Sequence, residues 1–285
     1  MNLLKVINLL KVIKMVKFQY ISDLHLEHYN NLNSIKFERI EGCDNLFLLG
    51  DIGCAYSDIY HEFINYCASN WVNVFVIFGN HEYYCRPNNI KTMEEIEREV
   101  LKFKENVYFL NNDHVLLNKH DNTVKKLLER EDHADEYIKI IGSTLWSNIS
   151  QVAASRMNDY RFIYTSPDSN LTPNETRSFF RMNKEYIIQE LQMDPFQTIV
   201  LTHHGVNSIC NGIYIGNPIE TGYATNIQEL TRFPNLIACI NGHTHVQIDT
   251  VIPNTNVKLL SNCYGYKGEN QDVVKYNKDA FLEVN

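Results

Sequence analysis

Short hydrophobic runs rich in β-branched residues recur along the chain and predict a series of β-strands. Eight such runs are four to seven residues long, which is an ordinary length for a strand. They span residues 16–21, 45–49, 74–78, 137–142, 198–201, 236–240, 246–252 and 257–261.

Amphipathic patterns between these runs predict helices. The third has a clear start, because Thr172 is a good N-cap, Pro173 suits the first helical position and Glu175 completes a capping box. Strands and helices alternate along the chain, and no linker rich in Pro, Gly and Ser divides it. The pattern predicts a layered α/β protein with residues 16–285 as a single domain. The predicted helices span about residues 57–69, 92–104, 174–193 and 226–232.

Three segments depart from this pattern. Residues 125–136 are dense in both charges and are expected to form a solvated hairpin tip or helix face. Residues 204–225 have no periodicity, and long loops of this kind are often binding loops or lids. Residues 1–15 contain the hexapeptide NLLKVI twice, and its lysines argue against a signal peptide and a membrane span. We expect a short disordered or helical extension there, with Met15 as an alternative start.

The composition narrows the class of partner. The chain has 285 residues, 44% of them hydrophobic, and a formal net charge of −8. This acidic balance argues against an extended nucleic-acid surface and against an anionic membrane as partner. The seven cysteines are scattered without a Cys-x-x-Cys pair, which indicates neither a disulfide framework nor a thiolate zinc site. Such cysteine usage fits a reducing compartment, and we expect a cytoplasmic protein.

Five of the predicted strands are each followed by a small group of nitrogen and oxygen ligands. The carboxyl ends of strands are where open α/β sheets build their sites, so these groups can converge from distant parts of the chain. A lone histidine after a strand is more often an ordinary hydrogen-bonded residue, but five groups in order would be a rare coincidence. The groups are Asp23 with His25, Asp51, Asn80 with His81, His203 with His204, and His243 with His245.

The chemistry of these side chains indicates metal binding. Asp, Asn and His without Cys suit divalent metals such as manganese, iron or zinc. Seven ligands are too many for one ordinary ion, but they suffice for two if one carboxylate bridges. Two metal ions ~3.5–4 Å apart are the arrangement used for phosphoester displacement. The seven candidate ligands are Asp23, His25, Asp51, Asn80, His203, His243 and His245.

The sequence resembles the calcineurin-like metallophosphoesterase family. Five of its segments look like the family's motif blocks in the family's order: SDLHLE, GDIG, GNHEYY, THHG and NGHTH. The resemblance runs from about residue 17 to residue 266. Three further segments, GSTLWS, MNDYRFI and SNCYGYKGEN, are similar to the subgroup of small bacterial-type calcineurin-like phosphoesterases.

The resemblance implies a central β-sandwich of two mixed sheets flanked by helices, and a role for each residue. Asp23, His25 and His245 would hold one metal ion, Asn80, His203 and His243 a second, and Asp51 would bridge the two. His81 would act on the scissile phosphate rather than bind metal, and His204 would lie behind the ligands or beside the substrate. The implied reaction is attack on phosphorus by a hydroxide that bridges the two ions.

The substrate is left open by the sequence. A small phosphoester such as a nucleotide is the expected partner, with Tyr83, Tyr84 and Arg86 as further candidates for binding it; rim packing is an equal alternative for these three. GDIGCAYSD lacks the Asp-Arg-Gly of phosphoprotein phosphatases, which argues against a protein phosphatase. Two alternatives to a small-molecule phosphoesterase are a non-catalytic protein-binding scaffold of the same fold and a nuclease of the same family.

Overall fold

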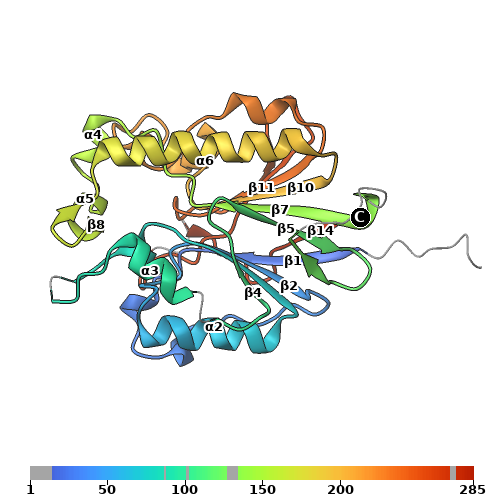
Figure 1. Ribbon diagram of the computed structural model, residues 1–285, viewed down its shortest axis with the longest axis horizontal. Coiled ribbons are helices and arrows are strands. Elements are labelled where there is room, and N and C mark those ends of the chain that lie inside the picture. Colours follow the sequence, from blue (N-terminus) through green and yellow to red (C-terminus); the bar gives the residue numbers. More distant parts are fainter. Residues whose placement is uncertain (1–14, 87, 101–102, 127–133, 270–273) are drawn as a thin grey trace, which may run out of the picture.

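Two β-sheets packed face to face form the centre of the molecule, and helices cover their outer faces (Figure 1). The computed structural model describes residues 15–86, 88–100, 103–126, 134–269 and 274–285. The expected α/β class, with two mixed sheets flanked by helices, is confirmed.

The first sheet has five strands in the order β14-β1-β2-β3-β4. Four are parallel, and β14 pairs antiparallel with β1 at one edge. Their bounds are β1 (Val16–Ile21), β2 (Asn45–Leu49), β3 (Asn73–Ile77), β4 (Val107–Phe109) and β14 (Phe281–Val284).

The second sheet has seven strands in the order β12-β13-β11-β10-β7-β5-β6. Strands β7, β10, β11 and β13 are parallel, while β5, β6 and β12 add antiparallel edges. The bounds are β5 (Asp113–Asn118), β6 (Val124–Lys125), β7 (Tyr137–Ser143), β10 (Gln197–Thr202), β11 (Leu236–Asn241), β12 (Ile248–Val251) and β13 (Lys258–Ser261). A separate hairpin joins β8 (Tyr164–Ser166) to β9 (Ser169–Asn170).

Helices α2 (Asp58–Asn70) and α3 (Met93–Val100) lie against the five-stranded sheet, and the long α6 (Pro173–Met193) lies on the opposite side, against the seven-stranded sheet (Figure 1). The predicted capping box of α6 is present, since Thr172 and Glu175 satisfy each other's backbone N–H groups. The short helices are α4 (Gln151–Ala154), α5 (Asp159–Phe162), η1 (Leu26–His28), η2 (Leu32–Ser34), η3 (His81–Tyr83), η4 (Ala134–Glu136), η5 (Ser208–Tyr214), η6 (Glu220–Gly222) and η7 (Gln228–Arg232).

Alternate side chains of the central strands pack in opposite directions. Phe18 and Phe47 point between the sheets, where their rings stack with centroids 4.8 Å apart and meet residues such as Ile140 of the second sheet. Leu46 and Leu48 point the other way, into the layer beneath the helices. Because both faces of these strands are buried, their sequences are hydrophobic at nearly every position.

The predicted strands are present, whereas one predicted helix has a different form. Residues 226–232 form the 3-10 helix η7 rather than an α-helix. The extension at residues 1–14 and most of the charged segment, residues 127–133, lie outside the described residues. Within the part of the chain that the structure describes, no helix is long and apolar enough to cross a membrane.

Candidate metal centre and active site

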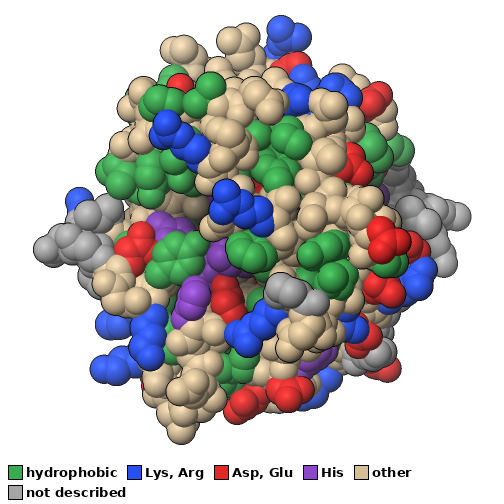
Figure 2. Space-filling model, turned by 90° about the vertical axis from the view of Figure 1, so that its left-hand side faces the viewer, with side chains coloured by type: hydrophobic (Ala, Val, Ile, Leu, Met, Phe, Trp, Pro, Cys, Tyr) green, Lys and Arg blue, Asp and Glu red, His purple; other side chains and the backbone are tan. Residues whose placement is uncertain are grey.

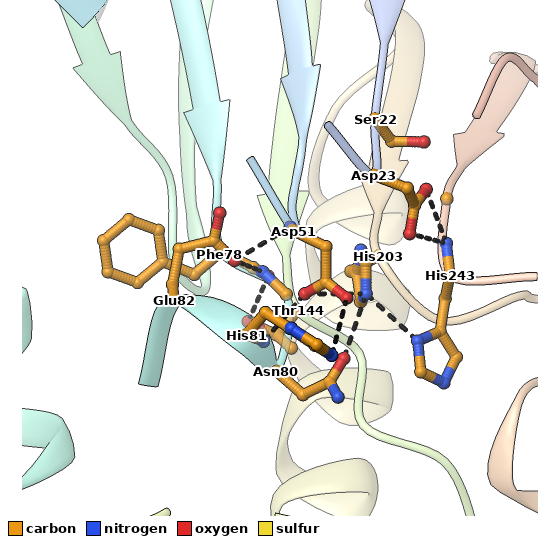
Figure 3. A network of polar contacts seen from close by, with 12 residues as sticks. Ser22, Asp23, Asp51, Phe78, Asn80, His81, Glu82, Thr144, His203 and His243 are labelled. Carbon is orange, nitrogen blue, oxygen red and sulfur yellow. Dashed lines mark hydrogen bonds and ion pairs between the residues drawn. The ribbon is translucent and has the colours of Figure 1, made fainter. Parts of the chain in front are cut away.

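The candidate ligands converge where the strands of both sheets end. Asp23, His25, Asp51 and Asn80 follow β1, β2 and β3 of the first sheet, while His203, His243 and His245 follow β10 and β11 of the second. Figure 3 shows five of them, Asp23, Asp51, Asn80, His203 and His243. All seven are buried. Their ligand atoms form two groups, one from Asp23, His25 and His245 and the other from Asp51, His203 and His243. The convergence expected from the strand-end positions is therefore present.

The backbone at these positions is unusual. Five of the seven have left-handed conformations, with φ angles between 49° and 72°: Asp23, His25, Asp51, His243 and His245. Non-glycine residues rarely adopt this conformation, and it concentrates at functional sites where surrounding structure enforces it.

Gly79 contributes by having no side chain. Its φ angle is not positive, so the position does not need glycine for a left-handed turn. A Cβ atom at this position would lie 2.2 Å from Asp51 Oδ1 and 2.6 Å from the His203 ring. Only glycine therefore lets the β3 loop pass this close to the two candidate ligands.

The tautomers of the four histidine ligands follow from their outward hydrogen bonds. His203 Nδ1 donates to the Leu49 carbonyl at 2.8 Å, and His243 Nε2 donates to the Gly222 carbonyl at 3.3 Å. His25 and His245 donate through Nδ1 to the carboxylates of Glu27 and Glu269, at 3.2 and 2.7 Å. Each outward nitrogen therefore carries the proton, and each inward nitrogen presents a lone pair to the centre.

These lone pairs face one another at distances so short that a positive charge between them would be stabilising. His25 Nε2 lies 3.0 Å from His245 Nε2, and His203 Nε2 lies 3.1 Å from His243 Nδ1 and 3.2 Å from Asn80 Oδ1. Acceptors this close repel unless a proton or a metal ion lies between them. The nitrogen and oxygen donors suit a borderline divalent ion, so the residues fit the metal that the sequence predicted.

Two of the four histidines, His203 and His245, have raised pKa values, whereas burial lowers the pKa of His25 and of His243. Burial disfavours charge on His203, yet the Asp51 carboxylate outweighs it and raises the pKa of His203 to about 9. Burial likewise opposes charge on His245, but Asp23 and Glu269 raise its pKa to about 10. The carboxylates thus create a negative field that favours cations, although the protein interior around it is apolar.

His81 lies beside this centre at the start of η3. Its backbone N–H donates to Asp51 Oδ1 at 2.8 Å, and its Nδ1 donates to Glu27 Oε1 at 2.8 Å. The ring stacks on Tyr84 with centroids 4.1 Å apart. Burial lowers the pKa of His81, but Asp51 and Glu27 more than compensate and raise it to about 9. The remaining nitrogen, Nε2, is 3.4 Å from the Tyr266 hydroxyl.

Four acidic residues that support the ligands were not identified from the sequence. Glu27 holds His25 and His81, Glu269 holds His245, and Asp159 accepts from Asn80 Nδ2 at 2.9 Å. The fully buried Glu82 accepts backbone N–H groups of Asp51, Ile52 and Gly79 at 2.7–2.8 Å (Figure 3). All four lie within segments that resemble the family, namely SDLHLE, GNHEYY, MNDYRFI and SNCYGYKGEN. That position is the feature of the sequence that could have identified them.

A cavity of about 240 Å³ opens onto the centre and is lined by Asp51, Asn80, His81, His243 and His245 among others. Figure 2 shows histidine side chains gathered in a recess of this face.

The other candidates for substrate binding occupy different places. Tyr84 lines the cavity. Tyr83 is buried between Phe78 and Trp146. Arg86 lines a separate hollow beside Cys54, and His204 is buried behind His243, with ring centroids 4.2 Å apart.

The sandwich and the Asp, Asn and His side chains at its strand ends define a metallohydrolase type of site. The chain belongs to the calcineurin-like phosphoesterase family, because the sequence model of that family matches residues 16–247. Membership supports a metal-dependent phosphoester hydrolase, with divalent metal ions as cofactors and a small phosphoester as substrate.

Two similar proteins cover nearly the whole chain. Uncharacterized protein L509 of Acanthamoeba polyphaga mimivirus is 25% identical over 292 residues, which span 93% of this chain and 96% of that protein. The crystal structure of phosphopantetheinyl hydrolase (PptH) from Mycobacterium tuberculosis has a TM-score of 0.67 and 17% identity, covering 90% of this chain and 91% of that one. The second likeness shows a shared fold.

Proposed function

We propose that the protein is a dinuclear metallophosphoesterase that hydrolyses a small phosphoester. One divalent ion would be held by Asp23, His25 and His245 and the other by Asn80, His203 and His243, with Asp51 shared between them. The ligand types favour manganese, iron or zinc.

The position of Asp51 carries this proposal. Its Oδ1 lies 3.3 Å from His203 Nε2, and its Oδ2 lies 4.0 Å from His25 Nε2. The two oxygens of one carboxylate thus face the two groups of imidazole lone pairs. A carboxylate so placed is suited to bridge two ions.

The bound ions would supply Lewis-acid chemistry, acidifying water and neutralising phosphoryl charge. The chain's own residues add orientation and a proton. Glu27 fixes Nδ1 of His81, so Nε2 is the atom that can donate a proton to the leaving-group oxygen. Asp159 holds the amide of Asn80 so that its Oδ1 points inward. The stack of His81 on Tyr84 keeps the imidazole from rotating away.

The test is activity and metal content measured together. We expect manganese-reconstituted protein to hydrolyse an aryl phosphomonoester or phosphodiester and to hold close to two ions per chain. Asp51→Asn should lower both quantities. His81→Ala should lower kcat by about 100-fold or more, the usual contribution of a general acid, while leaving metal content unchanged.

Three results would contradict the proposal in different ways. Protein that is inert toward monoesters, linear and cyclic diesters and nucleotides with manganese, iron, zinc and magnesium is not the proposed enzyme. If it also binds no metal, the non-catalytic scaffold is favoured. Tight, salt-sensitive binding of oligonucleotides together with their cleavage would favour the nuclease.

A further inference from the structure

The cavity over the metal centre has one wall that the proposed chemistry does not use. This wall consists of Arg156 and Asn158, from the connection between α4 and α5, and of Tyr214 and Tyr223, from the long loop between β10 and β11. Both tyrosines fall within residues 204–225, the segment whose lack of periodicity predicted a binding loop or lid. Its two tyrosines now lie at the mouth of the candidate active site.

The two tyrosines extend a row of rings outward from a candidate ligand. Tyr223 lies 5.3 Å from His243 between ring centroids, and Tyr214 stacks on Tyr223 at 4.5 Å with an angle of 23° between the rings. Tyr214 is half-buried, and Ile213 and Ile215 on either side of it are each 64% exposed. The row therefore ends in an apolar, partly open surface at the cavity rim.

A glycine shapes this loop. Gly212 adopts φ 50° and ψ −117°, a conformation open to glycine but not to other residues, and it interrupts η5 two residues before Tyr214. A Cβ atom there would also lie 3.0 Å from the Val246 side chain. The kink thus turns the chain and brings Tyr214 back against Tyr223.

Arg156 supplies the positive charge of this wall. Of the described residues that line the cavity, it is the one Lys or Arg, and its guanidinium forms no ion pair with the described carboxylates. Figure 2 shows basic side chains around the recess that holds the histidines. The segment is anchored three residues further on, where Asp159 bonds Asn80 and Tyr84. The anchored segment keeps Arg156 at the cavity wall, and its exposed side chain leaves the charge available to an anion.

We propose that Arg156, Tyr214 and Tyr223 form a subsite for the part of the substrate that is not transferred. This inference rests on the proposed phosphoesterase function. The subsite takes an alcohol that carries a planar aromatic ring and a second negatively charged group. The ring stacks on the tyrosines, since an aromatic face binds any base without reading its hydrogen-bonding edge. Arg156 grips the second anion through paired N–H groups.

The size of the cavity agrees with this division. Ligand pockets usually span roughly 300–1,000 Å³, and this one measures about 240 Å³. A space of this size does not enclose a whole nucleotide-sized substrate, so part of the substrate would extend along the wall formed by Arg156, Tyr214 and Tyr223. A nucleoside bisphosphate has the required ring and the required second anion.

The test compares specificity ratios in variants, so that general losses of activity cancel. The first ratio is kcat/KM for adenosine 3′,5′-bisphosphate over adenosine 5′-monophosphate, which reports the second anion. The second ratio is kcat/KM for adenosine 5′-monophosphate over ribose 5-phosphate, which reports the ring. Arg156→Gln should lower the first ratio about tenfold, as expected for hydrogen bonds to a charged group. Tyr214→Leu should lower the second ratio by about fivefold or more, the value of one base–aromatic stack.

Matched controls are present in the same chain. Arg161→Gln removes an exposed arginine of α5 that does not line the cavity. Tyr108→Leu removes a tyrosine of β4 that stacks on Phe75 at the same angle of 23° but does not line the cavity. Both controls should leave the two ratios unchanged.

The outcomes separate the subsite from the proposed function. If the enzyme hydrolyses phosphoesters but Arg156→Gln and Tyr214→Leu leave both ratios unchanged, the subsite is refuted and the proposed function stands. If wild-type protein hydrolyses nothing, the proposed function fails. The subsite is then decided by calorimetry with adenosine 3′,5′-bisphosphate, whose binding must weaken about tenfold in Arg156→Gln to sustain it.

Discussion

Replacing Gly79 with alanine should disable the metal centre although it adds only one methyl group. The new Cβ would lie 2.2 Å from Asp51 Oδ1, and ordinary contacts begin at 3.4 Å. The carboxylate or the loop would therefore have to move by about 1.2 Å, the difference between these distances. The same Cβ would also lie 2.6 Å from ring atoms of His203, so the loop cannot simply move away from Asp51 toward His203. No shift of one ligand relieves both contacts.

The magnitude follows from that displacement. A misplacement of ~1 Å in a catalytic constellation costs about 100-fold in rate, and overpacking a buried site costs about 1–3 kcal/mol of stability. We therefore expect Gly79→Ala to lower kcat/KM about 100-fold, to lower metal content below that of the wild type, and to lower Tm by a few degrees. Elemental analysis, steady-state kinetics on an aryl phosphate and thermal unfolding measure the three effects.

Gly42→Ala is the matched control for this experiment. Gly42 has a left-handed φ of 78° with nothing within 4 Å of its added Cβ, so alanine there brings backbone strain of about 1 kcal/mol without any steric conflict. It should lower Tm slightly and leave metal content and kcat/KM intact. The reasoning is refuted if Gly79→Ala keeps wild-type metal content and a kcat/KM within about threefold of the wild type.

Three further predictions concern acidic residues: Asp159 and Glu27 support the candidate site, and the buried Glu97 accepts from Tyr83 and Asn111. Asp159→Ala should weaken metal affinity about 10-fold or more, because the Asn80 side chain loses the carboxylate that holds it. Asp159→Asn keeps an acceptor oxygen and should weaken metal affinity less. Titration of metal into the apo-protein measures both affinities, and equal losses in the two variants would contradict the prediction. At saturating metal, Glu27→Ala should lower kcat about 10-fold or more with a smaller change in KM, because His81 loses the acceptor that orients it. Glu27 also accepts from the candidate ligand His25, so metal content is measured alongside, and an unchanged kcat would count against the role in orienting His81. Glu97→Gln should be more stable than the wild type near pH 8, since burial raises the pKa of Glu97 above its usual 4.5 and ionisation therefore opposes folding. That advantage should disappear as the pH falls through the folded-state pKa to 4.5, which denaturant unfolding at several pH values measures. A stability difference that does not change with pH, or one that favours the wild type near pH 8, would contradict the raised pKa.

The central strands could be predicted from the sequence because they are buried on both faces. Strands such as β2 and β3 consist almost entirely of apolar residues, and no helix pattern competes with that signal. Several strands at or next to a sheet edge, β4, β5 and β14 among them, were missed for the opposite reason. Strand β4 has three residues, β5 begins with Asp113 and His114, and β14 alternates between exposed and buried positions. Their pairing partners, rather than their own composition, make them strands.

The same contrast holds in the site. The seven candidate ligands could be found because each follows a recognisable strand at a fixed short distance. Two supporting contacts could not be predicted, since the bonds from His81 to Glu27 and from Asn80 to Asp159 join residues 54 and 79 positions apart. No periodicity relates such pairs, and only the packing of the loops brings them together. Residues 204–225 were predicted as a binding loop, but Tyr214 and Tyr223 could not be distinguished from its other residues without the stack they form.

The ligand geometry is maintained by the backbone rather than by cations alone. Left-handed conformations at non-glycine residues cost about 1 kcal/mol or more each, so five of them together require compensation. Backbone bonds between loops supply it, since Asp23 N–H donates to the Gly50 carbonyl and His25 N–H donates to the Asp51 carbonyl, both at 3.0 Å. The Glu82 carboxylate ties the β2 and β3 loops through three more N–H groups. Because these bonds involve none of the metal-facing atoms, the ligands are positioned before any ion binds, and a binding ion gains from that order instead of having to impose it.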